Sequence, residues 1–312
     1  MDQKHSSSSS KRKPKPELKV FETSADFKIQ LPMRNKKNEL KIADLSFRDG
    51  FFPQAQSAHY LRELSKIDFD LYYSYFGQYS RFVTRGPRLM KWFSDLKDAT
   101  YAFKKNDLGA VTLSTNEFSP RGLKPNPFPP VLQEIRTKIE KFLGVPSSHF
   151  NSALVNYYRD GNDSVAWHAD QDPWLGTNFT VPSVSFGAER AFQVRANHPK
   201  NSPVSEFKLK NGSLLLMQGM TQEGFQHSVP KRGGKRIGPR INITFRRVLP
   251  SLISKNPLGR SWDETKAAFL KFYKDVLSEQ DVASVLNAST PKTLYNMTSR
   301  LVKLKVASKK RT

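Results

Sequence analysis

The sequence predicts an α+β protein in which an antiparallel sandwich or jelly-roll barrel carries helices on one side. The first observation is a series of short strand-like runs separated by Gly, Asn and Pro, at residues 153–158, 181–187, 191–195, 206–210, 213–219 and 241–248. The second is an amphipathic helical pattern directly before these runs, and the third is a return to helical patterns after Pro250. Many short strands after a helical lead-in are typical of this architecture.

The helices are predicted from apolar spacing and from their end signals. One helix is expected over residues 54–67, and a second over residues 128–144, where prolines mark the start and Gly144 marks the end. The second helix has a single apolar stripe, formed by Val131, Leu132, Ile135, Ile139, Phe142 and Leu143. Near the C-terminus, Ser261 and Glu264 have the spacing of a capping box ahead of a helix over residues 265–277.

One turn signal stands out among the strands. Asn211 and Gly212 separate residues 206–210 from residues 213–219, and both residue types accept the positive φ angles of a tight turn. The pattern therefore predicts that these two strands form a β-hairpin.

Composition divides the chain into four parts. Residues 1–20 are rich in Ser, Lys and Pro and are expected to be a disordered basic tail. Residues 21–125 have a mixed pattern and are expected to form an N-terminal region for nucleotide recognition. Residues 126–250 hold the predicted jelly-roll core, and residues 251–312 form a helical extension with a basic tail.

Bulk composition narrows the function classes. The 312 residues include no cysteine, which excludes disulfides, cysteine nucleophiles and thiolate metal sites. No apolar run approaches the roughly 18 residues of a membrane-spanning helix, so no membrane partner is expected. The net charge is +23, and it is spread over the body as well as the two tails. A polyanionic partner, most simply nucleic acid, accounts for a basic body.

The strand at residues 239–247 carries an unusual polar face. Arg240, Asn242, Thr244 and Arg246 alternate with Ile241, Ile243 and Phe245. An exposed face of an ordinary half-buried strand shows the same alternation. In a jelly roll, however, one face lines the barrel, and two inward guanidinium groups need anions to offset their desolvation. A small dicarboxylate held at both ends would meet that need.

Two histidines and one aspartate complete the pattern. His168 and Asp170 are two residues apart at a predicted strand end, so they lie on one face. His227 follows the strand at residues 213–219. Two imidazoles and one carboxylate form the facial triad of non-haem Fe(II) oxygenases, which leaves positions open for a cosubstrate and for O₂. A hydrolytic zinc enzyme could use the same three ligands but leaves the two arginines unexplained.

These residues occur in segments that resemble the AlkB family of Fe(II)- and 2-oxoglutarate-dependent dealkylating dioxygenases, closest to its animal-type alkylation-repair members. The segments are NYYRDGNDSVAWHADQD, SVSFGAERAFQVR, GSLLLMQG, QHSVP and PRINITFR. The resemblance covers about residues 126–250. It implies a double-stranded β-helix (jelly-roll) core, Fe(II) as the metal, and 2-oxoglutarate and O₂ as cosubstrates.

The resemblance also implies roles for individual residues. His168, Asp170 and His227 would hold iron. Cosubstrate contacts would come from Arg240 at the distal carboxylate, Asn156 and Tyr158 beside it, and Asn242 and Arg246 near the other end. Asp172 stands where the family reads the flipped base, and aromatic residues for stacking on the base are expected to be Trp92, Tyr101 and Phe103.

The implied reaction is oxidative demethylation of bases such as 1-methyladenine and 3-methylcytosine in DNA or RNA. Single strands are expected to be preferred over duplex, because a buried methyl group requires base extrusion. The protein is expected to act as a monomer in the nucleus or cytoplasm. Two alternatives stay open, namely a non-catalytic nucleic-acid binder and a relative that acts on a protein or lipid.

Overall fold

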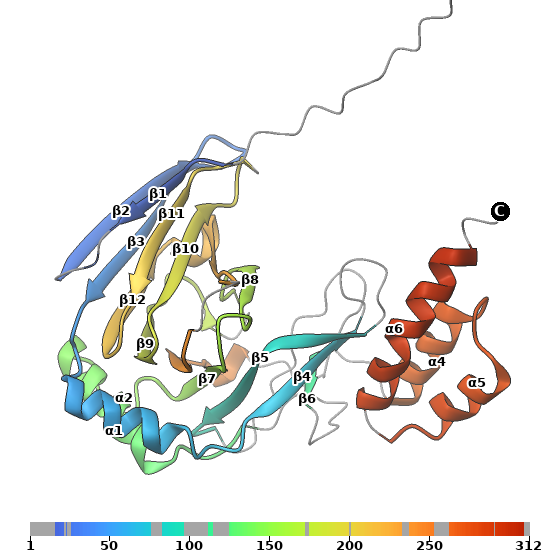
Figure 1. The fold of residues 1–312 in the computed structure, drawn as a ribbon. Helices are drawn as coiled ribbons and strands as arrows, with labels where there is room; N and C mark the ends of the chain where they lie inside the picture. The colour runs from blue at the N-terminus through green and yellow to red at the C-terminus, as the bar shows by residue number, and fades with distance from the viewer. Residues whose placement is uncertain are drawn as a thin grey trace, which may run out of the picture.

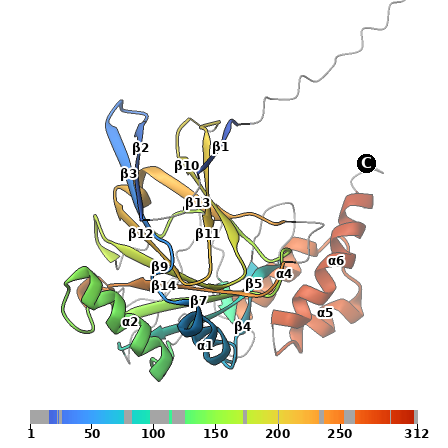
Figure 2. The ribbon, with the colours of Figure 1, turned by 60° about the vertical axis from the view of Figure 1, so that its left-hand side comes forward.

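Two β-sheets face each other in the computed structural model of the chain, and helices flank them (Figures 1 and 2). The structure describes residues 16–21, 23, 26–75, 83–96, 112–114, 125–171, 175–199, 201–232, 237–252, 262–289 and 291–308. The packed sheets confirm the predicted jelly-roll core with flanking helices. No helix in these ranges is both long enough and apolar enough to cross a membrane.

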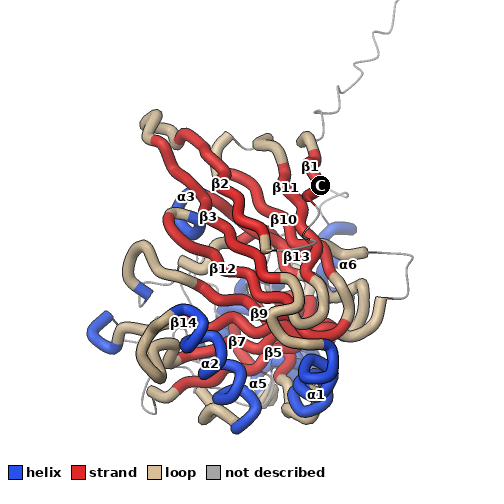
Figure 3. The backbone as a smooth tube through the Cα atoms, turned by 90° about the vertical axis from the view of Figure 1, so that its left-hand side faces the viewer, coloured by secondary structure: helices blue, strands red, loops and turns tan. Residues whose placement is uncertain are grey.

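The larger sheet has nine strands in the order β2-β3-β12-β9-β14-β7-β5-β4-β6. Its central strands lie side by side in Figure 3, with α1 and α2 on the near face. The strands are β2 (Phe27–Arg34), β3 (Leu40–Arg48), β4 (Asp70–Tyr75), β5 (Val83–Ser94), β6 (Thr112–Ser114), β7 (Ser152–Tyr158), β9 (Val181–Gly187), β12 (Ser213–Gly219) and β14 (Arg240–Arg246).

The smaller sheet has five strands in the order β1-β11-β10-β13-β8, so β1 and β8 are its edges. Apolar side chains from both sheets meet between them, including Phe47, Phe207, Leu215 and Phe225. The strands are β1 (Leu18–Phe21), β8 (Val165–His168), β10 (Arg190–Ala196), β11 (Val204–Leu209) and β13 (Phe225–Val229).

Two helices cover the outer face of the larger sheet, as the apolar stripes predict. α1 (Gln54–Leu64) ends three residues before the predicted end, while α2 (Pro130–Leu143) ends at Gly144 in the left-handed conformation. Their buried side chains, such as Tyr60, Leu132 and Ile139, pack against β-strand residues including Val184 and Phe245. A four-residue helix, α3 (Thr221–Gly224), connects β12 to β13.

The C-terminal extension is helical, as predicted. After a 3-10 turn at Pro250–Leu252 it forms α4 (Trp262–Tyr273), α5 (Glu279–Leu286) and α6 (Pro291–Ser308). These helices share a small core that also takes in Leu71 of β4. The predicted capping residue Ser261 lies outside the described residues, and a complete capping box occurs instead at Ser278 and Asp281 of α5.

The predicted hairpin at Asn211 and Gly212 is wrong. Gly212 has the expected positive φ of 75°, but β11 belongs to the five-stranded sheet and β12 to the nine-stranded sheet. The turn therefore carries the chain from one sheet to the other. An Asn-Gly pair specifies a tight turn through its backbone angles, whereas strand pairing depends on burial and neighbouring strands.

The N-terminal strands are built into the sheets. β3 pairs with β12, and β5 pairs with β7, so residues 21–125 contribute directly to the larger sheet. β1 pairs in parallel with β11, which places the last residues of the predicted basic tail in a strand. Residues 1–15 of that tail lie outside the described ranges.

Candidate active site

The polar face of β14 points into a cavity between the sheets. β14 is paired on both sides, with β7 and β9, and all seven of its residues are buried. The pattern is therefore not that of a strand with a solvated face. The cavity has a volume of about 210 Å³, and its walls include Arg88, Asn156, Tyr158, His168, Asp170, His227, Arg240, Asn242, Thr244 and Arg246.

Arg240 is a buried cation in the wall of this cavity, and it has no ion-pair partner among the described residues. Its side chain is 1% exposed, and its Nη2 donates a hydrogen bond to Ser185 Oγ at 2.9 Å. Its Nε and Nη1 have no hydrogen-bond partner among the described residues. Burial lowers the pKa of Arg240 to about 10, so the group keeps its charge at neutral pH. Two guanidinium nitrogens with free N–H groups on a buried arginine fit a carboxylate ligand.

Tyr158 lies opposite Arg240 on the paired strand β7, and Asn156 lies opposite Asn242. The Arg240 guanidinium lies 5.0 Å from the centre of the Tyr158 ring. Asn156 Oδ1 accepts a hydrogen bond from Arg88 Nε at 2.7 Å. Arg88 is a cavity residue that the sequence reasoning missed. It precedes Trp92 on β5 by an even number of residues, so the two side chains lie on the same face of the strand.

The other end of the polar face meets Asp170. Arg246 Nη2 lies 3.0 Å from Asp170 Oδ1, and Arg246 Nη1 donates to Thr244 Oγ1 at 2.8 Å. The Arg246 guanidinium also lies 5.5 Å from the centre of the Trp92 ring. Trp92 is 4% exposed, so it packs in the cavity wall against Arg246. Its predicted stacking on a base stays a prediction.

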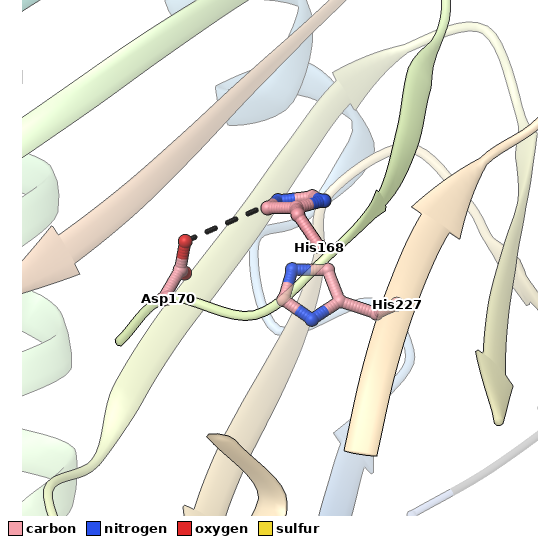
Figure 4. A group of neighbouring side chains, drawn as sticks. All are labelled: His168, Asp170 and His227. Carbon is pink, nitrogen blue, oxygen red and sulfur yellow. Dashed lines mark ion pairs between the residues drawn. The ribbon is translucent and has the colours of Figure 1, made fainter. Parts of the chain in front are cut away.

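The two histidines lie opposite each other on neighbouring strands. His227 of β13 pairs with His168 of β8, and their ring centres are 4.2 Å apart. Asp170 follows β8, and its Oδ1 lies 4.0 Å from His168 Nε2 (Figure 4). One potential ligand atom from each of the three residues lies within 4.8 Å of the others. The structure thus brings together the three residues that the sequence predicts.

A hydrogen bond sets which ring nitrogen of His168 carries a proton, and burial keeps His227 neutral. His168 Nδ1 lies 2.8 Å from the Ala166 carbonyl, which can only accept, so His168 Nε2 keeps its lone pair. Burial, together with the neighbouring His168, lowers the pKa of His227 to about 3, which keeps His227 neutral. Neutral imidazoles are the form that binds metal ions.

Asp170 is held as a carboxylate by its surroundings. Burial by itself raises its pKa, but the charge of Arg246 and the hydrogen bond from its guanidinium outweigh burial and leave the pKa well below its usual range. Its backbone N–H donates to Gln222 Oε1 at 2.8 Å, a contact that no sequence motif indicates. Asp170 Oδ2 is buried and has no hydrogen-bond partner among the described residues.

This donor set fits a divalent metal and a dicarboxylate together. Two neutral imidazoles and one carboxylate with a free oxygen match a facial Fe(II) site with open positions. Arg240 offers free N–H donors at the far wall, within a cavity of suitable size for a small acid. A hydrolytic zinc site would leave Arg240 without a function.

Asp172, Tyr101 and Phe103 lie outside the described residues. Their roles at the base stay predictions.

The chain is similar in sequence to known proteins. The 2OG-Fe(II) oxygenase superfamily matches residues 45–246. Human "Alpha-ketoglutarate-dependent dioxygenase alkB homolog 3" is 36% identical over 184 residues, which are 56% of this chain and 55% of that protein. Its mouse counterpart is 38% identical over 173 residues, covering 53% and 52%. Human "DNA oxidative demethylase ALKBH2" is 39% identical over 166 residues, covering 51% and 59%.

The chain thus spans about half the length of the curated relatives it matches. Superfamily membership implies Fe(II), with 2-oxoglutarate and O₂ as cosubstrates, and His168, Asp170 and His227 supply a donor set for the metal. The matched segment contains all three of these residues and the complete β14 face. This chain belongs to the 2OG-Fe(II) oxygenase superfamily, and its predicted resemblance to the AlkB family is confirmed.

Proposed function

We propose that this protein demethylates N-alkylated bases, such as 1-methyladenine and 3-methylcytosine, in DNA or RNA as part of alkylation-damage repair. One observation carries the proposal. A single cavity holds a His-Asp-His donor set on one wall and, on the facing strand, a buried arginine with free N–H donors. The names of the similar human and mouse proteins support the same reaction class.

The protein's own groups act by positioning. Arg240 binds the distal carboxylate of 2-oxoglutarate, with Tyr158 beneath its guanidinium and Asn156 nearby. Asn242 and Arg246 lie toward the metal end of the acid. Fe(II) bound by the triad supplies oxidation by O₂, with 2-oxoglutarate as the electron donor and with succinate and formaldehyde among the products. The buried walls exclude water and hold the methyl group close to the metal.

Arg246 also acts on the metal ligand Asp170. Its ion pair with Asp170 keeps that ligand charged while the metal is absent and orients one carboxylate oxygen. The other oxygen, Oδ2, has no partner among the described residues and is available as a ligand atom. The charge of Arg246 also lies near the site for the second carboxylate of the cosubstrate.

The substrate class follows from charge. 1-Methyladenine and 3-methylcytosine are cationic near neutral pH, so the carboxylate of Asp172 favours them over uncharged bases. The net charge of +23 suits a nucleic-acid backbone and argues against an uncharged lipid substrate. A purely non-catalytic binder has no need for an intact donor set.

Single strands are the proposed preferred substrate. Extrusion of a base from a duplex costs a few kcal/mol, and a duplex enzyme offsets this cost with an apolar wedge. One residue of the sequence, Phe82 in the segment SRFVTRG, has the apolar side chain that such a wedge needs, and it lies outside the described residues. Single-strand binding needs only a basic groove and aromatic stacking, worth about 1–3 kcal/mol per base. The protein is proposed to act as a monomer in the nucleus or cytoplasm.

The test is mass spectrometry of methylated oligonucleotides incubated with protein, Fe(II), 2-oxoglutarate and ascorbate. Oligonucleotides with one 3-methylcytosine or one 1-methyladenine are expected to lose the methyl group, faster as single strands than as duplexes. Asp170→Ala is the matched inactive control. Unchanged oligonucleotides with the wild-type protein would refute the proposed substrate, and equal rates on both forms would refute the strand preference.

A further inference from the structure

The strand that carries His168 is the most weakly held strand of the metal site. β8 has four residues and lies at the edge of the five-stranded sheet, where β13 is its one neighbour among the described strands. It pairs with β13 at two positions, His168 with His227 and Val165 with Val229, and the register shifts between them. Backbone pairing alone therefore specifies the position of β8 poorly.

The register of β8 matters because of the alternation of side chains along a strand. A slip of one residue moves every side chain to the opposite face of the sheet. Such a slip would replace His168 by one of its neighbours, Trp167 or Ala169, at the metal site. Something other than the short ladder must fix this register.

Arg190, the first residue of β10, makes the contacts that do so. It is 1% exposed and donates to three backbone carbonyls. Nη1 bonds to Asp160 O at 3.0 Å, and Nη2 bonds to Asp163 O at 2.7 Å and to Pro230 O at 2.9 Å. Asp160 and Asp163 lie in the loop that leads into β8, and Pro230 directly follows β13. One guanidinium thus joins the two strands at the end of their ladder opposite the histidine pair.

The two joined segments also fit each other closely. The Arg232 N–H donates to Gly161 O at 2.8 Å, and a Cβ added to Gly161 would lie 2.7 Å from Arg232 O. The Asp163 carboxylate stiffens the loop by accepting bonds from Arg159 Nε and Nη2 at 2.8 and 2.7 Å. The loop is therefore a rigid piece that Arg190 can hold in place.

We propose that Arg190 is a positioning residue for the metal site: it fixes the register of β8 on β13 and so keeps His168 opposite His227. The inference rests on the proposal that His168, Asp170 and His227 bind a divalent metal. Arg190 is not among the residues that line the cavity, and its hydrogen bonds within the described structure go to main-chain carbonyls and to none of the three ligands. Its effect on metal binding is through the backbone of the two segments.

A purely electrostatic role makes a different prediction. The guanidinium groups of Arg190 and Arg240 both lie on the Tyr158 ring, 5.4 and 5.0 Å from its centre, so Arg190 could act through its charge. Lysine keeps that charge but is a point donor and cannot reproduce a planar fork that reaches three carbonyls. Arg190→Lys therefore separates the two roles.

The test measures Mn²⁺ binding to the full-length protein by electron paramagnetic resonance of the free ion, without cosubstrate or nucleic acid. The variants are Arg190→Met, Arg190→Lys and, as a matched control, Arg136→Met. Arg136 is also a buried arginine, but it belongs to α2 and bonds to Asp95 and to the Phe150 carbonyl. Far-UV circular dichroism and thermal unfolding establish that each variant is folded.

We expect Arg190→Met to weaken Mn²⁺ binding about tenfold, at the lower end of the range for residues that orient metal ligands. Arg190→Lys is expected to bind Mn²⁺ clearly more weakly than the wild-type protein. Arg136→Met is expected to bind Mn²⁺ with an affinity close to that of the wild type, despite a similar loss of stability. Hydrogen exchange of the β8 amides should be faster in both Arg190 variants. If Arg190→Met does not fold, Arg190→Lys alone decides.

Two results would overturn the inference. Wild-type affinity in Arg190→Lys would mean that charge matters and the three-carbonyl clamp does not. An equal loss in Arg190→Met and Arg136→Met would mean a general loss of stability. Failure of the wild-type protein to bind Mn²⁺ would instead remove the metal site on which the inference rests.

Discussion

The two walls of the cavity are built in opposite ways. The cosubstrate wall is β14, a central strand that pairs with β7 and β9 without a register shift. The metal wall includes β8, a short edge strand whose single ladder is irregular. The cosubstrate residues are therefore fixed by backbone hydrogen bonds on both sides, whereas His168 depends on side chains and on the loop that precedes it.

This difference indicates where each wall is vulnerable. On β14, a substitution removes the function of the side chain that is changed and leaves its neighbours in place. Around β8, a substitution several residues away can displace a ligand, because the ladder supplies little of the constraint. The following predictions test this contrast, from the largest expected effect to the smallest.

Loss of a metal ligand should have the largest effect. His227→Ala is expected to reduce Mn²⁺ affinity and turnover by more than the roughly 100-fold seen when residues that orient ligands are lost. His149→Ala is the matched control, because His149 lies outside the cavity. Turnover close to wild type in an iron-supplied His227→Ala protein would remove His227 from the ligand set.

Loss of the buried cation on β14 should come next. Arg240→Met is expected to raise the 2-oxoglutarate requirement at least about 30-fold, since an unpaired carboxylate in a buried site costs about 2–5 kcal/mol. Mn²⁺ affinity without cosubstrate should stay near wild type, because β14 is held independently of β8. Arg247→Met is the control, since Arg247 is exposed one residue past the strand. An unchanged cosubstrate titration would contradict the assigned role.

A pair of glycine substitutions probes the two walls by the same chemical change. A Cβ on Gly187, where φ is 94°, would lie 2.4 Å from Pro239 O beside Arg240. A Cβ on Gly161 would press on the segment after β13. Each Ala variant is expected to lose about 1–3 kcal/mol in the free energy of unfolding, measured in urea.

Their binding defects should differ. Gly187→Ala is expected to weaken 2-oxoglutarate binding, and Gly161→Ala to weaken Mn²⁺ binding. If both variants lost 2-oxoglutarate affinity and Mn²⁺ affinity in the same proportion, the two walls would not be independent.

The smallest effect concerns acid stability of the loop before β8. Burial by itself raises the pKa of Asp163, but the hydrogen bonds from Arg159 outweigh burial and bring the pKa below its ordinary value. The Asp163 contribution to stability is therefore present above about pH 4 and is lost as pH falls through the lowered pKa. Asp163→Asn should be less stable than wild type at pH 7, and the difference should shrink at pH 3. A constant difference would contradict this.

The sequence predicts the two walls to different extents. The β14 face is visible in the sequence as an alternation, but an exposed strand face has the same pattern, and only the expected jelly roll directs it inward. The triad is recognisable through residue types and spacing. Arg190 and Gln222 were not predictable, since their partners are main-chain groups brought close only by folding. The hairpin at Asn211 failed because a turn motif does not specify which strands pair.

One measurement tests the central claim most directly: repaired base and succinate are quantified in the same reaction on a single-stranded oligonucleotide with one 3-methylcytosine. A demethylase in which Arg240 and the triad share one cavity should yield one succinate for each base repaired, and both products should disappear without 2-oxoglutarate or in Asp170→Ala. Succinate formed at the same rate without the oligonucleotide, or no repaired base at all, would contradict the account.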